Sequence, residues 1–301
     1  MEDLILVAGA TGDLGGKLCR SLLDKGARVR ALIREESDRK KVEELRRSGV
    51  EVVAIRFKEE DGLITACKGV SCVISALAGL RDVIITAQSQ LLNAAIKAGV
   101  PRFVPSDFCT DFTQIEPGEN RNFDLRREFK DILDASDIQA TSILNGAFAY
   151  VLRYDIPLLD TRSKSITYYS GKADWQIDFT TVEDAAAFTA CAALDADAPR
   201  SLRIASFRTD PDELAALTQK VFGERFDLNE KGTLEQFSAY IKKTRAEDPE
   251  GESQLYPQWQ QMQYLHSMFA AHHHTLDNDR YAGLTWHTAE MTLKEINNKK
   301  A

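Results

Sequence analysis

The sequence predicts an α/β protein built on a doubly wound parallel sheet, with a smaller, mainly helical lobe toward the C-terminus. Two observations carry this prediction. Short apolar, β-branched segments alternate with longer segments of helical period, and a glycine-rich loop directly follows the first apolar segment. The length of 301 residues, with 44% hydrophobic and 28% charged residues, suits one large domain with a smaller addition. Helical crossovers between parallel strands then favour the doubly wound arrangement.

Six strands and their connecting helices account for the first half of the chain. The clearest helix runs from Asp82 to Lys97, where Val83, Ala87, Leu91 and Ala95 recur every four residues and can line one buried face. The predicted strands lie near residues 4–8, 28–33, 51–55, 71–76, 102–105 and 140–144.

The regular alternation weakens after about residue 150, so we place a domain boundary there. Residues 1–155 are expected to hold the main sheet and residues 156–301 the smaller lobe, with residues 182–205 returning to the sheet through a helix and a strand. Residues 165–170 and 175–180 are interpreted as a hairpin around Gly171. The rest is predicted to be mostly helical, with a charged loop at 245–252 and a long amphipathic helix at 257–274 that would serve as a lid.

The charge balance and the cysteines restrict the class of partner. With 38 Lys and Arg against 46 Asp and Glu, the net charge is −8, which argues against a nucleic-acid partner. The five cysteines are scattered without a C-x-x-C pair, and no run of 18 apolar residues occurs. We therefore expect a cytoplasmic protein that acts on a small molecule, without a membrane partner. A protein partner would fit only a regulator, and the oligomeric state stays open.

The glycine-rich loop is the strongest functional signal. It places Gly9, Gly12 and Gly15 between an apolar strand and a helix. Gly9 and Gly12 would let backbone N–H groups approach a pyrophosphate, Gly15 would allow close packing of helix and strand, and the helix N-terminus adds partial positive charge. The alternative is a tight turn without a ligand. The complete predicted loop is Gly9, Ala10, Thr11, Gly12, Asp13, Leu14 and Gly15.

The residue after the second strand indicates which nicotinamide dinucleotide binds. Arg34 stands there, and a guanidinium suits the extra phosphate of NADP, whereas a carboxylate would prefer the ribose hydroxyls of NAD. The basic residues 39–41 follow nearby, although Glu35 and Glu36 lie next to Arg34. We predict NADP(H), with NAD(H) less favoured.

The glycine loop and four other motifs together resemble those of one known family. They are the glycine loop itself, Val73-Ile-Ser-Ala-Leu77, Gln88 in its helix, Arg102-Phe-Val-Pro-Ser-Asp-Phe108, and Asn145 with Phe148. This set resembles the NmrA-like, isoflavone-reductase-like branch of the atypical short-chain dehydrogenases, over nearly the whole chain. The resemblance implies a Rossmann fold with a cofactor laid across the carboxyl ends of its strands. It places Ser75, Ala76, Leu77 and Gln88 along the middle of the cofactor, and Pro105, Ser106, Phe108 and Asn145 near its ring. Caps, turns or core packing are the alternative roles for these residues.

The chain departs from the family at the position of its acid/base residue. Reductases of this family use a lysine in a Phe-x-x-Lys context, and here that context reads Phe123-Asp-Leu-Arg126. Arginine does not exchange a proton in the useful range. Lys130 lies one helical turn further on. Three outcomes stay open: Lys130 relays the proton, Arg126 orients a substrate oxygen as a fixed electrophile, or the protein binds the dinucleotide without catalysis. A solvated helix face is the alternative for both residues.

Two other patterns are weighed and set aside. Tyr168 and Lys172 match the Tyr-x-x-x-Lys spelling of ordinary short-chain dehydrogenases, but they lie in the predicted hairpin rather than on a helix. The histidines at 266, 272–274 and 287 lack a completing set of ligands, so no metal is predicted.

We therefore expect an NADP(H)-dependent oxidoreductase of the isoflavone-reductase-like type, which transfers hydride to a small aromatic, enone or quinone-like substrate. The alternative is a non-catalytic NADP(H)-binding redox sensor that acts through a protein partner, as the missing lysine would permit. An epimerase-like enzyme is less favoured, because the sequence lacks the tyrosine that such chemistry would use.

Overall fold

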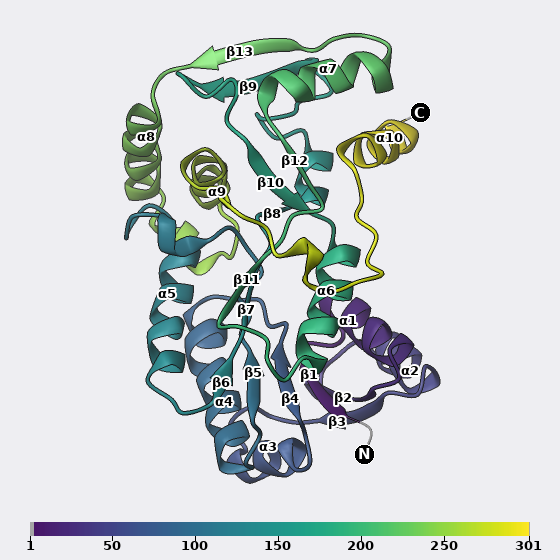
Figure 1. Ribbon diagram of the computed structural model, residues 1–301. Coiled ribbons are helices and arrows are strands. Elements are labelled where there is room, and N and C mark those ends of the chain that lie inside the picture. Colours follow the sequence, from purple (N-terminus) through teal and green to yellow (C-terminus); the bar gives the residue numbers. More distant parts are fainter. Residues whose placement is uncertain (1–2, 301) are drawn as a thin grey trace.

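The main sheet of the computed structural model, which describes residues 3–300, has six parallel strands in the order β3-β2-β1-β4-β5-β6 (Figure 1). The predicted doubly wound sheet is confirmed. The strand order reverses between β1 and β4, where the carboxyl ends of such sheets open a crevice for ligands. The strands are β1 (Leu4–Ala8), β2 (Arg28–Ile33), β3 (Glu51–Ala54), β4 (Cys72–Ser75), β5 (Arg102–Val104) and β6 (Gln139–Ala140). The outermost residues of the two predicted domains, 1–2 and 301, lie outside the described residues.

Helices cover both faces of this sheet because alternate side chains of its strands point to opposite sides. Ile5 and Val7 of β1 belong to a core shared with α1, α2 and α6, whereas Leu4 and Leu6 belong to a core shared with α3, α4 and α5. The helices are α1 (Asp13–Asp24), α2 (Arg39–Arg47), α3 (Glu60–Cys67), α4 (Gln88–Lys97), α5 (Arg121–Asp134) and α6 (Val182–Leu194). A π-helical segment, η1 (Asp82–Ala87), forms the first part of the helix predicted at 82–97.

The last predicted strand of the first half divides in two. Its first part, β6, pairs with β5, and its second part, β7 (Ser142–Leu144), pairs in parallel with β11 (Ser201–Arg203). Helix α6, which lies between β7 and β11 in the sequence, packs on α1 at one face of the main sheet. Residues 182–203 thus lie against the first half of the chain, while the domain boundary near residue 155 stays a prediction.

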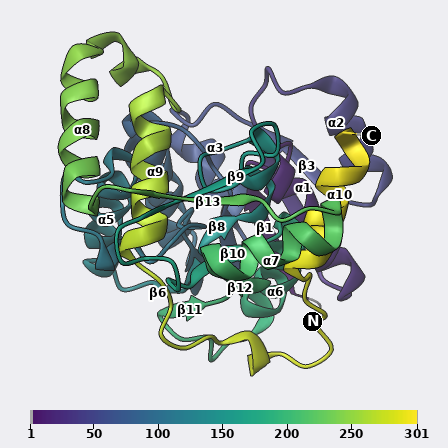
Figure 2. The ribbon, with the colours of Figure 1, turned by 90° about the horizontal axis from the view of Figure 1, so that it is seen from above.

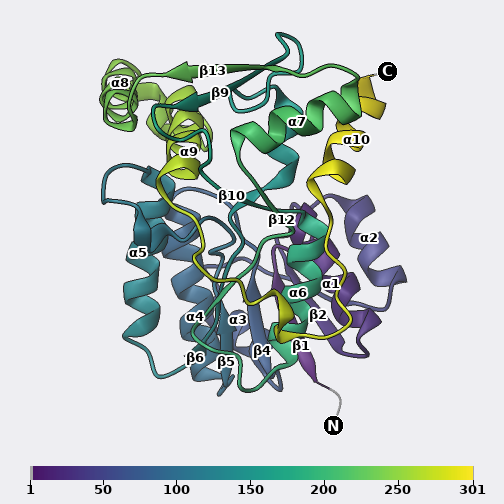
Figure 3. The same ribbon diagram turned by 45° about the horizontal axis from the view of Figure 1, so that its top comes forward.

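A third core lies above the carboxyl edge of the sheet and unites the remaining elements (Figures 1 and 3). The predicted hairpin is wrong: β9 pairs in parallel with β13, while β10 pairs with β12 and β8. In β9, Ser165 pairs with Asp227, and a partner so far along the chain leaves no local signal in the sequence. The remaining strands are β8 (Ala147–Phe148), β9 (Ser165–Tyr169), β10 (Ile177–Thr180), β12 (Phe207–Thr209) and β13 (Asp227–Lys231).

The helices of this region differ from the expected bounds. The predicted charged loop is largely helical, because α8 continues through Arg245 and a short helix follows it, with Asp248 capping the turn. The predicted long helix ends at Ala270, before the three consecutive histidines. Figure 2 shows α8 and α9 side by side. The helices are α7 (Pro211–Phe222), α8 (Leu234–Glu247), α9 (Gln258–Ala270) and α10 (Ala289–Lys300), and the short 3-10 segments are η2 (Phe112–Gln114), η3 (Ala149–Tyr154), η4 (Pro249–Ser253) and η5 (Asn278–Arg280).

The segment between α9 and α10 passes back over the first half of the chain (Figure 3). The backbone N–H of Asp277 donates to the carbonyl of Arg203, and the ring of His287 lies 2.8 Å from the Asp184 carboxylate. These contacts attach the C-terminal region to β11 and α6. Within residues 3–300, every helix is too short or too polar to cross a lipid bilayer.

Candidate functional site

The glycine loop forms a backbone cradle at the switch point of the sheet. Gly9 has a φ of +84°, and a Cβ there would lie 2.5 Å from the carbonyl oxygen of Ala76, at the end of β4. A Cβ on Gly15 would lie 2.2 Å from the carbonyl oxygen of Gly9. Gly12 is the N-cap of α1, and no side chain caps that helix end. The loop therefore approaches β4 closely and leaves the helix N-terminus open, as a bound diphosphate requires.

The charge of Asp13, the charged residue of the loop, is compensated by a neighbouring lysine. Asp13 is exposed and pairs with Lys17, which also reaches Glu183 at 3.5 Å. Lys41 of α2 donates from its Nζ to the carbonyl oxygen of Thr11 at 3.1 Å, a contact that sequence reasoning missed. Beside the loop, a hollow of about 360 Å³ lies between α1 and α2, and its lining includes Thr11, Gly12, Asp13, Lys17 and Lys41. Leu14 instead packs against the core under α1.

Arg34 is exposed directly after β2. Within the described residues, no side-chain hydrogen bond or ion pair engages its guanidinium. The neighbouring Glu35 binds Arg56 at 2.8 Å, so this carboxylate does not neutralise Arg34. A free guanidinium at this position is what an additional phosphate on the ribose would need.

The ends of β4 and β5 are joined by polar side chains. Ser106 donates from its Oγ to the carbonyl oxygen of Leu77 at 2.6 Å, and its backbone N–H donates to Oε1 of Gln88 at 2.9 Å. The amide nitrogen of Gln88 in turn donates to the carbonyl oxygen of Ile84. Gln88 and Ser106 therefore hold the crevice together, and their predicted contact with a cofactor stays a prediction. The backbone N–H of Ala76 donates to Ala8, which fixes the end of β4 beside β1.

Two fully buried polar side chains at this edge of the sheet have no partner. Ser75 and Asn145 are both 0% exposed, and the Oγ of Ser75 and both side-chain polar atoms of Asn145 make no hydrogen bond. Unpaired buried polar groups cost about 1–3 kcal/mol each. Other buried side chains, such as His273 and Gln260, also have unpaired atoms, but Ser75 and Asn145 lie at the carboxyl ends of β4 and β7, where a ligand would satisfy them. Together with the open cradle, they fit a bound dinucleotide.

Pro105 and Phe108 lie on the segment that follows β5. Both are buried, and Phe108 belongs to the core that also contains Ala10, Ile74 and Val104. The side chain of Phe108 thus has the core role that was its alternative, and any contact with a cofactor ring stays a prediction.

Arg126 and Lys130 share α5 but have different surroundings. Arg126 is half-buried, and its charge acts on the thiol of Cys109 and on the hydroxyl of Tyr264, beyond the carboxyl end of β5. Lys130 binds Asp134 at 2.6 Å, and Asp134 also binds Arg200, which directly precedes β11 and donates to the hydroxyl of Ser142. Lys130 is thus engaged by an ion pair, whereas no carboxylate of the described residues contacts the Arg126 guanidinium.

A group of tyrosines stands over the same edge, and sequence reasoning missed most of it. Tyr256 and Tyr264 of the lid region have ring centroids 6.3 Å apart, and Tyr150 stacks on Phe148 at 5.7 Å. Burial raises the pKa of Tyr150 to about 12, with contributions from Tyr256, Tyr264 and the carboxylate of Asp13 in the glycine loop. Tyr150 also packs edge-on against Tyr154, with ring centroids 6.2 Å apart. The only local signal was the occurrence of tyrosines at 150 and 154.

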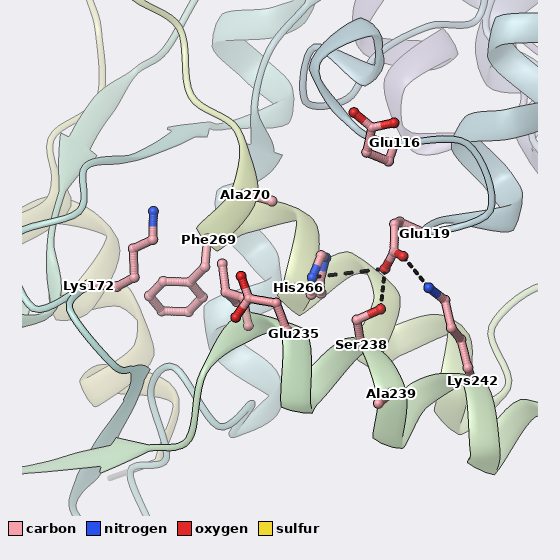
Figure 4. A pocket seen from close by; sticks show the side chains of 11 residues that line it. Glu116, Glu119, Lys172, Glu235, Ser238, Ala239, Lys242, His266, Phe269 and Ala270 are labelled. Carbon is pink, nitrogen blue, oxygen red and sulfur yellow. Dashed lines mark hydrogen bonds and ion pairs between the residues drawn. The ribbon is translucent and has the colours of Figure 1, made fainter.

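A second pocket lies on another side of α9, between α8 and the loop before α5 (Figure 4). It has a volume of about 540 Å³, and none of the predicted site residues lines it. In it, Glu119 accepts from Ser238 at 2.6 Å and pairs with Lys242, while His266 lies 4.0 Å away. Figure 4 shows these three side chains gathered around Glu119, whereas no interaction is drawn from Glu116, Lys172 or Glu235.

The two patterns set aside earlier have other surroundings. Tyr168 lies in β9 and bonds to Glu230, whereas the Lys172 ammonium sits 3.3 Å from the centroid of the Trp175 ring. They do not form a pair on one helix face. Among the described residues, no three His, Cys, Asp or Glu side chains converge as metal ligands would.

Comparison with known proteins adds a family to this geometry. The model of the NmrA-like family matches residues 1–285. Phenylcoumaran benzylic ether reductase PT1 of Pinus taeda is 30% identical over 236 residues, which cover 72% of this chain and 74% of the relative. Pinoresinol reductase 1 of Arabidopsis thaliana is 29% identical over 244 residues, which cover 74% and 75% of the two chains. Both relatives are named as reductases.

Solved structures share the fold. That of AtPrR2 with NADP+ and (+)-pinoresinol has a TM-score of 0.79 and 22% identity, covering 98% of this chain and 99% of that one. The complex of leucoanthocyanidin reductase from Vitis vinifera with NADPH has a TM-score of 0.78 and 21% identity, with 97% and 99% covered.

Proposed function

We propose that this chain, which belongs to the NmrA-like family, is an NADPH-dependent reductase of a small aromatic, enone or quinone-like substrate. The observation that carries the proposal is the open cradle at Gly9 and Gly12 beside the unpaired buried side chains of Ser75 and Asn145. The reductase names of its relatives and the nicotinamide dinucleotides named with two similar folds support the same conclusion.

The residues divide the binding of NADPH among them. The backbone N–H groups of residues 9–15 and the N-terminus of α1 would hold the diphosphate, and Arg34 would hold the additional phosphate. Ser75 and Asn145 would satisfy their hydrogen-bonding capacity near the nicotinamide end. Bound NADPH supplies the hydride.

The remaining residues prepare the substrate. Arg126 would bind and orient a substrate oxygen with its fixed positive charge, since its guanidinium does not exchange protons near neutral pH. Tyr150, Tyr256 and Tyr264 would provide an aromatic wall and exclude water from the reacting atoms. Lys130 has no part in this arrangement. The five free cysteines suit a reducing compartment, so we place the protein in the cytoplasm.

The test combines binding with turnover. The affinity for NADP+ and NAD+ is measured by calorimetry, and NADPH oxidation is followed at 340 nm with a panel of quinones and aryl enones. Arg34→Asp is expected to weaken NADP+ binding about 10- to 100-fold, as the loss of charge-assisted hydrogen bonds predicts, and to leave NAD+ binding nearly unchanged. Absence of NADP+ binding in the wild-type protein would refute the proposal. Tight binding without oxidation of NADPH across the panel would favour the redox sensor.

A further inference from the structure

Arg126 holds a half-buried positive charge that no carboxylate of the described residues neutralises by direct contact. Its Nη1 donates to the carbonyl oxygen of Asn122 at 2.9 Å, one turn earlier in α5. Its Nε is buried without a partner, and no hydrogen bond to Nη2 is found among residues 3–300. The whole Nε–Nη2 edge of the guanidinium is thus free of protein partners.

Three other partly buried arginines have a carboxylate partner, whereas the buried Arg102 donates to the backbone carbonyls of Ala192 and Ala193. Arg203 binds Asp111 at 2.8 Å, and Arg208 binds Asp178 at 2.6 Å. Arg127, the neighbour of Arg126 in α5, binds Asp124 at 2.8 Å. Burying a cation without a counter-ion is costly, and these arginines avoid the cost by ion pairing. Arg126 does not.

Among the groups that face Arg126, Asp107 acts on its charge without contacting it directly, and the other two are neutral. Burial raises the pKa of the Cys109 thiol, and burial raises the pKa of Tyr264 to about 12, so both are neutral at pH 7. Asp107 accepts a hydrogen bond from Ser142 through Oδ2 at 2.6 Å, while its Oδ1 has no partner. Burial raises the pKa of Asp107, against the opposing effects of Ser142 and of the charge on Arg126.

The surroundings of this free edge are aromatic and lie next to the crevice. Tyr264 packs edge-on against Phe123 at 5.5 Å and faces Tyr256. The backbone N–H of Asn145 donates to the carbonyl oxygen of Cys109 at 3.0 Å, which places Arg126's neighbour Cys109 directly beside the proposed nicotinamide end.

We infer that Arg126 anchors the carboxylate of an aromatic acid, which would accept a charge-assisted hydrogen bond from Nη2. The guanidinium stays charged near neutral pH, whereas a buried lysine ammonium readily loses its proton. The inference rests on the proposed reductase function and narrows its substrate class to arylcarboxylates. The arginine that replaces the family's lysine thereby becomes a specificity-determining residue.

The experiment compares acids with their methyl esters. Benzoate, cinnamate and 4-coumarate, and the methyl ester of each, are titrated by calorimetry into the full-length protein saturated with NADP+. We expect at least one acid to bind about tenfold or more tightly than its ester. Arg126→Gln should reduce this ratio to within about twofold, and Arg126→Lys should retain part of it. Arg81→Gln, which removes an exposed arginine paired with Glu128, serves as the matched control and should keep the wild-type ratio.

Two results would overturn the inference: no acid of the panel binds more tightly than its ester, or the preference survives in Arg126→Gln. If Arg126→Gln does not fold by circular dichroism, the wild-type ratio and its decrease in Arg126→Lys decide the question. NADP+ binding is measured first, so its absence refutes the reductase proposal separately. The acid and ester titrations are then repeated on the protein without NADP+, and the same two results would overturn the inference there.

Discussion

Gly9→Ala tests the close approach on which the cofactor cradle depends. The added Cβ would lie 2.5 Å from the carbonyl oxygen and 2.9 Å from the carbonyl carbon of Ala76, and both atoms belong to the backbone at the end of β4. That backbone is fixed by the hydrogen bond from Ala76 to Ala8, so the overlap is relieved only if β1 and β4 separate at their carboxyl ends.

The expected cost has two parts. A non-glycine residue at a φ of +84° costs about 1–2 kcal/mol, and the steric overlap costs about 1–3 kcal/mol. The reduced entropy of the unfolded chain offsets about 0.4–1 kcal/mol. We therefore expect the free energy of unfolding to fall by about 2–4 kcal/mol, with NADP+ binding weakened about tenfold because the gap between the strands widens.

Gly49→Ala provides the matched control, because Gly49 has a φ of +91° but no atom within 4 Å of the position of its Cβ. It carries the backbone cost alone, which we expect to be about 1 kcal/mol after the entropic offset. Urea unfolding of both variants gives the comparison, and calorimetry with NADP+ gives the affinities. Equal destabilisation by the two substitutions would refute the steric argument, and unchanged NADP+ affinity in Gly9→Ala would refute the link to the cradle.

The remaining predictions concern two ion pairs. Lys130→Gln is expected to change NADPH turnover with the best acceptor of the panel by less than about twofold. The reason is that the ammonium is engaged by Asp134, and such partly exposed pairs contribute little. A tenfold loss of turnover would restore Lys130 as a proton relay. Burial alone would raise the pKa of Asp111, but hydrogen bonds from Thr113 and Arg203 outweigh it and lower the pKa. This pair therefore stabilises the fold fully above the unfolded value near 3.9, and the effect is lost as the pH falls through the lowered value. The Arg203 side chain is 35% exposed, and Arg203→Met should lower the free energy of unfolding by about 1–3 kcal/mol at pH 7 and by less at pH 3. Urea unfolding at both pH values measures this difference. An equal decrease at both would contradict the pairing.

The local patterns of the sequence were sufficient for the main sheet. The strands β1, β2 and β4 are fully or largely buried, so their apolar runs are unambiguous, and short crossovers fix their parallel order. The pairing of β9 with β13 was beyond reach, because both strands are short and β13 is polar. Its identity as a strand depends on tertiary contacts, which no local pattern records.

The candidate site shows the same division between local and distant constraints. The glycines of the loop could be predicted because they form a local motif between a strand and a helix, although the close approach of Gly9 is to Ala76, far along the chain. The contact of Lys41 with Thr11 and that of Phe123 with Tyr264 join parts of the chain that are far apart in sequence. Residues 126 and 130 share a helix face in the sequence pattern, but one turn of helix carries Lys130 about 6 Å further from the crevice, toward Asp134 and Arg200.

The exchange of lysine for arginine also changes how the charge at position 126 depends on pH. Burial lowers the pKa of Arg126, but Cys109 and Tyr264, once they ionise at high pH, together with Asp107 raise this pKa by more. The guanidinium therefore stays charged throughout the range in which proteins fold, whereas a buried lysine readily loses its proton. With an arylcarboxylate that is itself ionised above about pH 6, both partners keep their charge. The preference for acid over ester should consequently stay level from about pH 6 to about pH 9 in the wild-type protein, and decline toward alkaline pH in Arg126→Lys. A decline in both proteins would mean that another titrating group, rather than the guanidinium, carries the recognition.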